Sequence, residues 1–172
     1  MSLLSMLDDN AKPQVLYVKD KQGVYRLAPL KDVLITARRQ VGKLLPRGSK
    51  LNSTQRVKGF LNTKLSALEH ETFAAIFLDA QLAKIEYEEI FKGTINQAQV
   101  YPRELAKMAL EYGANGVIIA HNHPSGFEKA SASDIHLTKI LKDSLSLFEI
   151  KLLDHIIVAG NKTLSFAEEG LL

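Results

Sequence analysis

The stretch Gly116-Val-Ile-Ile-Ala-His-Asn-His-Pro-Ser-Gly126 decides how the rest of the chain is interpreted. Its apolar first half is typical of a strand buried on both faces of a sheet. Side chains two residues apart on a strand point to the same face, so His121 and His123 can bind one ion. Pro124 and Gly126 follow directly and predict the end of the strand.

Further strands and helices are expected to alternate around this stretch. Short apolar or alternating runs predict the strands, and capped segments with helical periodicity predict the helices. The expected strands are 73–78, 84–91, 116–121 and 150–158, and the expected helices are 54–65 (with a possible end at 68), 103–112 and 133–148. This alternation predicts an α/β fold with a central sheet.

The first 49 residues are expected to form a small N-terminal extension. Residues 14–18 and 23–27 flank a polar turn and predict a hairpin, and residues 30–45 have helical spacing. Pro46-Arg-Gly-Ser49 then interrupts the pattern. We therefore expect an extension over 1–49 and a main domain over 50–172.

Composition narrows the class of protein. The chain has 172 residues, of which 46% are hydrophobic, as expected for one globular domain with a short addition. It has no cysteine, which excludes disulfides, thiolate metal ligands and cysteine nucleophiles. No apolar run is long enough to cross a bilayer, and the N-terminus lacks the basic region of a secretory signal. We expect a cytoplasmic protein without a membrane partner, and the sequence does not indicate its oligomeric state.

The positive charge is concentrated in one stretch. Eight Lys or Arg and no Asp or Glu lie between Arg38 and Lys64, so this stretch carries +8 while the whole chain carries +3. Such a stretch can bind weakly to nucleic acid, or it can be a solvated helical face. Both interpretations remain open.

A third metal ligand is expected near the two histidines. A catalytic zinc ion takes three protein ligands and leaves one position for water, and neutral imidazole is a common ligand. Asp134 lies in the first turn of the helix predicted after the His pair. Ser131 and Asp134 also fit a capping box, which is favoured when these two residues are taken alone. Together with His121 and His123, the metal site is favoured.

Other zinc chemistries fit less well. The nucleoside deaminases need a Pro-Cys-x-x-Cys segment, and the chain has no cysteine. The His-Glu-x-x-His pattern of zincins is absent. No Gly-x-Ser-x-Gly nucleophile elbow surrounds Ser125.

The His121-x-His123, Ser131 and Asp134 pattern resembles the signature of JAMM (MPN+, or JAB) metalloproteases. Several longer strings are similar to the bacterial RadC branch of that family, over about residues 50 to 172. They are His121–Gly126, Phe91-Lys-Gly-Thr94, Tyr101-Pro-Arg-Glu104, Asp154–Val158 and Ser165-Phe-Ala-Glu-Glu-Gly170. The chain is expected to be a short form without the helix-hairpin-helix segment of many RadC proteins.

The resemblance implies a fold, an activity and residue roles. The fold is of the JAMM/MPN (cytidine deaminase-like) type, a curved mixed sheet flanked by helices. The implied activity is hydrolysis of a peptide or isopeptide bond in a peptide or protein substrate, with Zn²⁺ held by His121, His123 and Asp134. Glu71 is the expected general base, with Glu69 as the second candidate. Ser131 is expected to stabilise the oxyanion of the tetrahedral intermediate.

Two rival functions remain open at this point. One is a DNA-associated RadC-like protein, connected with DNA repair or a mobile element, that uses the basic 38–64 stretch and has a weak or vestigial zinc site. The other is a non-catalytic scaffold.

The chain departs from RadC proteins in the loop between the ligands. Those proteins usually carry Asp-Pro-Thr-Pro where this chain has Phe127-Glu-Lys-Ala130, so a less rigid loop is expected. Asp154-His155 can be a second layer behind the metal ligands or a hydrogen-bonded pair at the sheet end. His70 and His136 are expected on the surface.

Overall fold

The computed structural model describes residues 16–19, 21–30, 32–33, 36–37, 45–51, 53–92 and 101–172. The chain divides into two compact units, residues 1–39 and 40–172. In the smaller unit, β1 (Tyr17–Lys19) and β2 (Tyr25–Leu27) pair antiparallel as a hairpin. The helix expected over 30–45 is helical at residues 30, 32–33 and 36–37 and has ended by Leu45, which lies in a bend. Residues 31, 34–35 and 38–44 lie outside the described part. The domain boundary at residue 49 stays a prediction.

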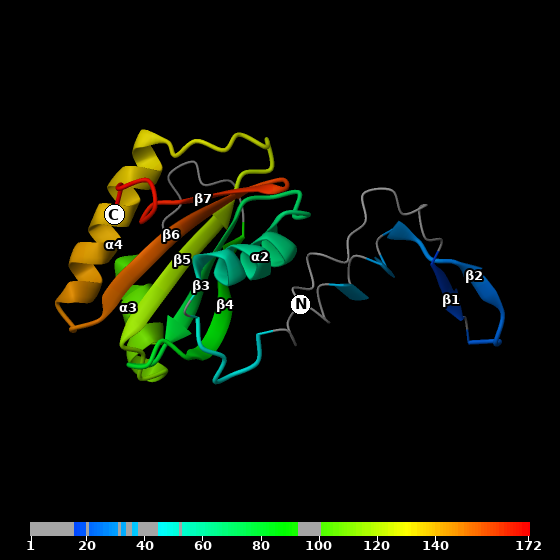
Figure 1. The fold of residues 1–172 in the computed structure, drawn as a ribbon, viewed down its shortest axis with the longest axis horizontal. Helices are drawn as coiled ribbons and strands as arrows, with labels where there is room; N and C mark the ends of the chain where they lie inside the picture. The colour runs from blue at the N-terminus through cyan, green and yellow to red at the C-terminus, as the bar shows by residue number, and fades with distance from the viewer. Residues whose placement is uncertain are drawn as a thin grey trace. The chain divides into compact units, whose positions relative to one another are not determined.

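The larger unit is built on a five-stranded mixed sheet of order β4-β3-β5-β6-β7 (Figure 1). Only the central β5–β6 pair is parallel among the pairs of this sheet. The strands are β3 (Thr72–Leu78), β4 (Lys84–Lys92), β5 (Gly116–Asn122), β6 (Lys151–Ala159) and β7 (Lys162–Ser165). Four of the five were expected from the sequence, and β7 was missed. The predicted α/β class with a mixed sheet flanked by helices is confirmed.

Three helices cover the two faces of this sheet (Figure 1). α2 (Thr54–Leu65) packs on one face, and α3 (Pro102–Glu111) and α4 (Ala132–Ser146) pack on the other. Pro102 begins α3, where its missing N–H costs no hydrogen bond. None of the helices in the described part of the chain is both long enough and apolar enough to span a bilayer.

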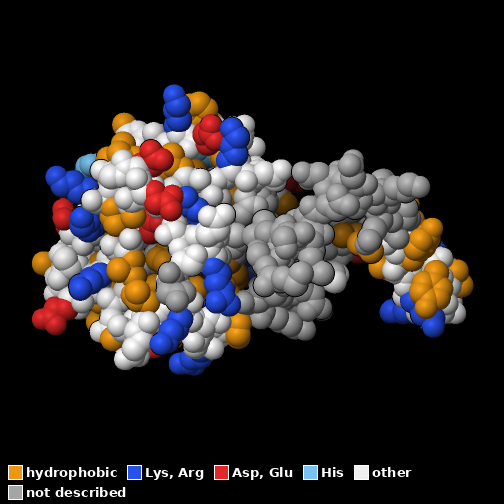
Figure 2. Space-filling view, viewed as in Figure 1, with side chains coloured by type: hydrophobic (Ala, Val, Ile, Leu, Met, Phe, Trp, Pro, Cys, Tyr) orange, Lys and Arg blue, Asp and Glu red, His pale blue; other side chains and the backbone are white. Residues whose placement is uncertain are grey.

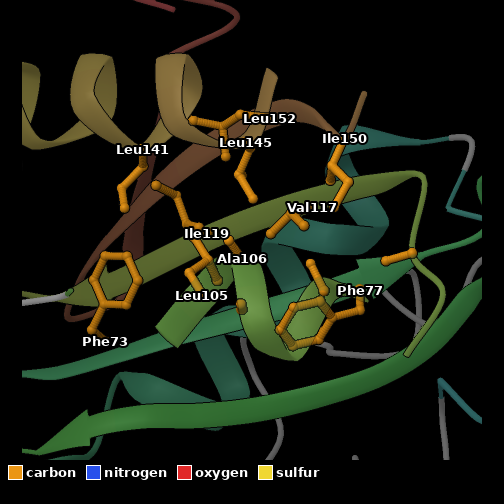
Figure 3. Close-up of a cluster of buried hydrophobic side chains, with 13 residues drawn as sticks. Phe73, Phe77, Leu105, Ala106, Val117, Ile119, Leu141, Leu145, Ile150 and Leu152 are labelled. Carbon is orange, nitrogen blue, oxygen red and sulfur yellow. The ribbon is translucent and has the colours of Figure 1, made fainter. Parts of the chain in front are cut away.

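Strand periodicity divides the core into two clusters. On β5, Val117 and Ile119 point toward α3 and α4, while Ile118 and Ala120 point toward α2. Figure 3 shows the first cluster, where Phe73 and Phe77 of β3 share one layer with side chains of the two helices. His121 is the next residue of the Val117 and Ile119 series. It therefore lies at the end of β5 on the face covered by α4.

Candidate metal centre

Three side chains converge where β5 ends and α4 begins. In the described part of the chain, His121, His123 and Asp134 form a group whose ligand atoms all lie within 4.8 Å of one another. The His121 Nε2 atom lies 2.9 Å from His123 Nε2 and 3.3 Å from Asp134 Oδ1. His123 Nε2 lies 3.8 Å from Asp134 Oδ2. The structure thus brings together the three residues that the sequence predicts as ligands.

The backbone around His123 orients its ring. His123 follows β5 directly, and its amide still donates to the Val158 carbonyl of β6 at 2.8 Å. Its Nδ1 atom lies 2.6 Å from the Phe127 carbonyl oxygen, which can only accept a hydrogen bond. Nδ1 therefore carries a hydrogen, and in the neutral ring the lone pair lies on Nε2. Gly126, with a φ of 75°, closes the turn that brings the Phe127 carbonyl back to the ring.

Asp134 serves as a helix cap and faces the histidines at the same time. Its Oδ2 atom accepts from the Ser131 amide at 2.8 Å and from the Ser131 hydroxyl at 2.7 Å. The Asp134 amide donates to Ser131 Oγ at 3.1 Å, which completes the capping box. Oδ1 is left to face His121. The cap interpretation and the ligand interpretation of Asp134 are therefore compatible.

This group fits a zinc ion. Tetrahedral zinc with bonds of about 2.0–2.2 Å holds its ligand atoms about 3.3–3.6 Å apart. His121 Nε2 lies 2.9 Å from His123 Nε2 and 3.3 Å from Asp134 Oδ1, so small shifts of the side chains would admit the ion. Two imidazole nitrogens and a carboxylate are a donor set that zinc accepts in catalytic sites. The nitrogens face each other and an anion in a buried corner, an arrangement that a cation stabilises.

Burial also keeps His121 neutral. Burial lowers the pKa of His121 to about 4, with Asp134 acting in the opposite direction and His123 in the same direction. The pKa of His155 is lowered well below its usual value by burial and by the neighbouring His121 and His123. A neutral imidazole has the free lone pair that metal binding requires.

The two candidate bases lie just before β3. Glu71 is half-buried and directly precedes Thr72, and Glu69 is exposed. Phe73 is paired with His121, a candidate ligand, across the antiparallel β3–β5 ladder. Glu71 lies two residues before Phe73 in the sequence. Neither glutamate belongs to the three-residue metal group. Glu71 as general base and Ser131 as an oxyanion donor stay predictions.

The neighbouring residues Asp154 and His155 contact different parts of the protein. The Asp154 carboxylate accepts from the Ser165 hydroxyl at 2.6 Å and from the Ala167 amide at 3.0 Å, and so holds the C-terminal turn. His155 instead lies with Nε2 2.8 Å from His121 Nδ1. His70 and His136 are exposed, as expected.

One further residue was not singled out from the sequence. Asn122, between the two histidines, accepts from the Thr72 amide and donates to the Leu68 and His70 carbonyls. It therefore fastens the segment that carries Glu69 and Glu71 to the end of β5.

Fold and site together define a class of protein, a mixed α/β domain of the JAB/MPN type with a buried His-His-Asp group. Residues 51–171 match the family model described as "RadC-like JAB domain", and the chain belongs to that family. It is 45% identical to a UPF0758 protein of Nitrosomonas eutropha over 150 residues, which cover 87% of this chain and 67% of that protein. A UPF0758 protein of Leptothrix cholodnii is 43% identical over 162 residues, which cover 94% of this chain and 73% of the relative.

Proposed function

We propose that this protein is a zinc-dependent hydrolase that cleaves peptide or isopeptide bonds in a peptide or protein substrate. The observation that carries the proposal is the convergence of His121 Nε2, His123 Nε2 and Asp134 Oδ1 in one buried corner. The other polar atom of each of these side chains is occupied by a hydrogen bond within the protein. The three ligand atoms are thus oriented before any ion binds.

The remaining roles in the proposed reaction fall to Glu71 and Ser131. Zinc in such a site lowers the pKa of a water molecule and polarises a carbonyl. The Glu71 carboxylate accepts the proton of the attacking water and passes it to the leaving amine. The position of Glu71, two residues before the partner of His121 in the ladder, supports this role.

Ser131 already has a structural role. Its single hydroxyl hydrogen is donated to Asp134 Oδ2 at 2.7 Å, so it cannot at the same time donate to a substrate oxygen. In the proposed reaction the Ser131 hydroxyl must turn from Asp134 toward the oxyanion. Ser131→Ala should therefore weaken both zinc binding and turnover, whereas an oxyanion role alone would lower turnover only.

The first experiment measures the metal. Elemental analysis of the purified protein should find one zinc ion per chain, and the double variant His121→Ala/His123→Ala should lose it. The matched control is His70→Ala/His136→Ala, which removes two exposed histidines and should keep the zinc. Equal zinc in wild type and the His121/His123 variant contradicts the proposed site.

The second experiment separates the ligands from the base. Glu71→Gln should keep the zinc and lower hydrolysis of fluorogenic peptides and isopeptides by at least about 100-fold, since an amide cannot accept the proton. Glu69→Gln is the matched control and should stay near wild-type turnover. Loss of zinc in Glu71→Gln would make Glu71 a ligand, and unchanged turnover would transfer the role to Glu69.

The alternative function, DNA association through the 38–64 stretch, stays a prediction. Two of its cations are already engaged: Lys58 pairs with Glu168, and the Lys64 ammonium lies over the rings of Phe60 and Tyr87. Figure 2 shows basic and acidic side chains interspersed over the visible face of the molecule where the sheet and its helices lie. A salt titration of duplex DNA binding tests it, because phosphate contacts weaken steeply as salt rises.

A further inference from the structure

His155 is a buried histidine that the proposed reaction does not use. It lies on β6 with 0% exposure, and its ring packs against Phe166 at 4.5 Å between centroids. Both ring nitrogens have polar neighbours: Nε2 lies 2.8 Å from His121 Nδ1, and Nδ1 lies 2.6 Å from Thr138 Oγ1. Among the described residues, the hydrogen-bonding neighbours of this fully buried ring are an imidazole and a hydroxyl and not a carboxylate, so the ring is neutral.

A series of hydrogen bonds links His121, His155 and Thr138 to the backbone carbonyl of Asp134. This carbonyl determines the direction of each hydrogen bond in the series. Thr138 Oγ1 lies 2.6 Å from the Asp134 carbonyl oxygen, which can only accept, so the hydroxyl hydrogen points there. Thr138 Oγ1 must then accept from His155, which puts the ring hydrogen of His155 on Nδ1.

The same reasoning extends to the metal ligand. With its hydrogen on Nδ1, the neutral ring of His155 has a lone pair on Nε2. That lone pair accepts from His121 Nδ1 at 2.8 Å. His121 therefore carries its hydrogen on Nδ1, and its Nε2 atom faces His123 and Asp134 as a pure acceptor.

We propose that His155 and Thr138 are positioning residues that hold the hydrogen of His121 on Nδ1 and thereby direct its Nε2 lone pair to the metal. The inference deepens the proposed zinc site and rests on it for its purpose. An outer partner that accepts from the free N–H of a ligand histidine sets its tautomer and ring orientation. In this protein the outer partner that accepts from His121 is a neutral histidine, His155.

The helix supplies both ends of this arrangement. Thr138 follows Asp134 by one turn of α4, and the carbonyl that orients the Thr138 hydroxyl belongs to Asp134 itself. The first turn of α4 therefore places the carboxylate ligand and, through Thr138 and His155, sets the tautomer of His121. The first turn of α4 thus orients Asp134 directly and His121 of β5 through Thr138 and His155.

The first test needs neither a variant nor a metal. The ¹⁵N chemical shifts of the imidazoles in the metal-free wild-type protein report which ring nitrogen carries the hydrogen. The expected result is the Nδ1–H form for both His121 and His155. The Nε2–H form at either residue overturns the inference. If the protein binds no zinc at all, the proposed function fails, and this measurement still decides the inference.

The second test uses variants of the hydroxyl. Thr138→Val keeps the shape of the side chain but removes the acceptor, and should weaken zinc binding by about 10- to 100-fold in a chelator competition. Thr138→Ser restores the hydroxyl and should stay within about threefold of wild type. Ser144→Ala is the matched control, because Ser144 makes the same hydroxyl-to-carbonyl bond on α4, to Ile140, away from the site.

These variants can refute the inference in two ways. Unchanged zinc affinity in Thr138→Val overturns it. Equal losses in Thr138→Val and Thr138→Ser also overturn it, because they assign the effect to packing rather than to the hydroxyl. Thermal unfolding of each metal-free variant shows that the comparison is made between folded proteins.

Discussion

Replacing Asn122 by alanine should destabilise the metal-free protein by about 3 kcal/mol. Asn122 is 2% exposed and makes three hydrogen bonds to backbone: from the Thr72 amide at 2.7 Å, and to the Leu68 and His70 carbonyls at 3.3 and 3.1 Å. The Thr72 amide belongs to a fully buried residue, and a buried N–H without a partner costs about 1–3 kcal/mol. The two carbonyls belong to less buried residues and lose about 0.5–1 kcal/mol each.

Urea unfolding measures this cost, and Asn62→Ala is the matched control. Asn62 also donates to a backbone carbonyl, that of Gly160 at 2.8 Å, but in an exposed setting, so its loss should cost less than about 1 kcal/mol. Hydrogen exchange at the Thr72 amide should speed up in Asn122→Ala and not in Asn62→Ala. Equal costs for the two variants would refute the assignment of Asn122 as the clamp on the segment before β3.

Two further predictions concern pH and the core. Burial holds the pKa of His121 near 4, so the unfolded chain binds more protons than the folded protein between about pH 6.5 and pH 4. The stability of the metal-free protein should therefore fall by roughly 3 kcal/mol as the pH is lowered through this window. Urea unfolding at pH 7 and pH 5 should show about 2 kcal/mol of this loss in wild type and in the exposed control His136→Gln, and a smaller loss in His121→Gln. Identical losses in the three proteins would contradict the prediction. Leu141→Ala, at a 0% exposed site under the sheet, should cost about 2–5 kcal/mol by thermal or urea unfolding. Leu147→Ala, at an 81% exposed site, should cost less than about 0.5 kcal/mol, and comparable costs would contradict the core assignment.

The strands with a continuous apolar or an alternating pattern could be predicted from the sequence, including β4 at one edge of the sheet, and the short edge strand β7 could not. β3 and the first part of β5 are continuous apolar runs, and runs this short favour a buried strand over a buried helix. β7 has four residues, Lys162-Thr-Leu-Ser, and its extended conformation follows from pairing with β6 rather than from its own composition. Pairing between segments is not visible in a single sequence.

The convergence of His121, His123 and Asp134 could be predicted because their spacing is local, whereas the positions of the residues behind them depend on strand register. His121 and His123 belong to one strand end, and Asp134 carries a capping signature that is readable in the sequence. The place of His155 depends on the parallel ladder in which Ile119 is paired with His155. A shift of one residue in that ladder would turn His155 to the opposite face.

The side chains of His121, Asn122 and His123 alternate between the two faces of the sheet, because successive residues of a strand point to opposite faces. The histidines point to the face covered by α4, where Asp134 lies, and Asn122 points away from it toward residues 68–72. Because β3 runs antiparallel to β5, the beginning of β3 lies beside the end of β5, and Phe73 is paired with His121. The end of β5 therefore carries two candidate ligands and is also hydrogen-bonded to the segment with the proposed base. A change at Asn122 should accordingly disturb Glu71 before it disturbs the metal, so Asn122→Ala should lose hydrolysis at conditions where it still binds zinc.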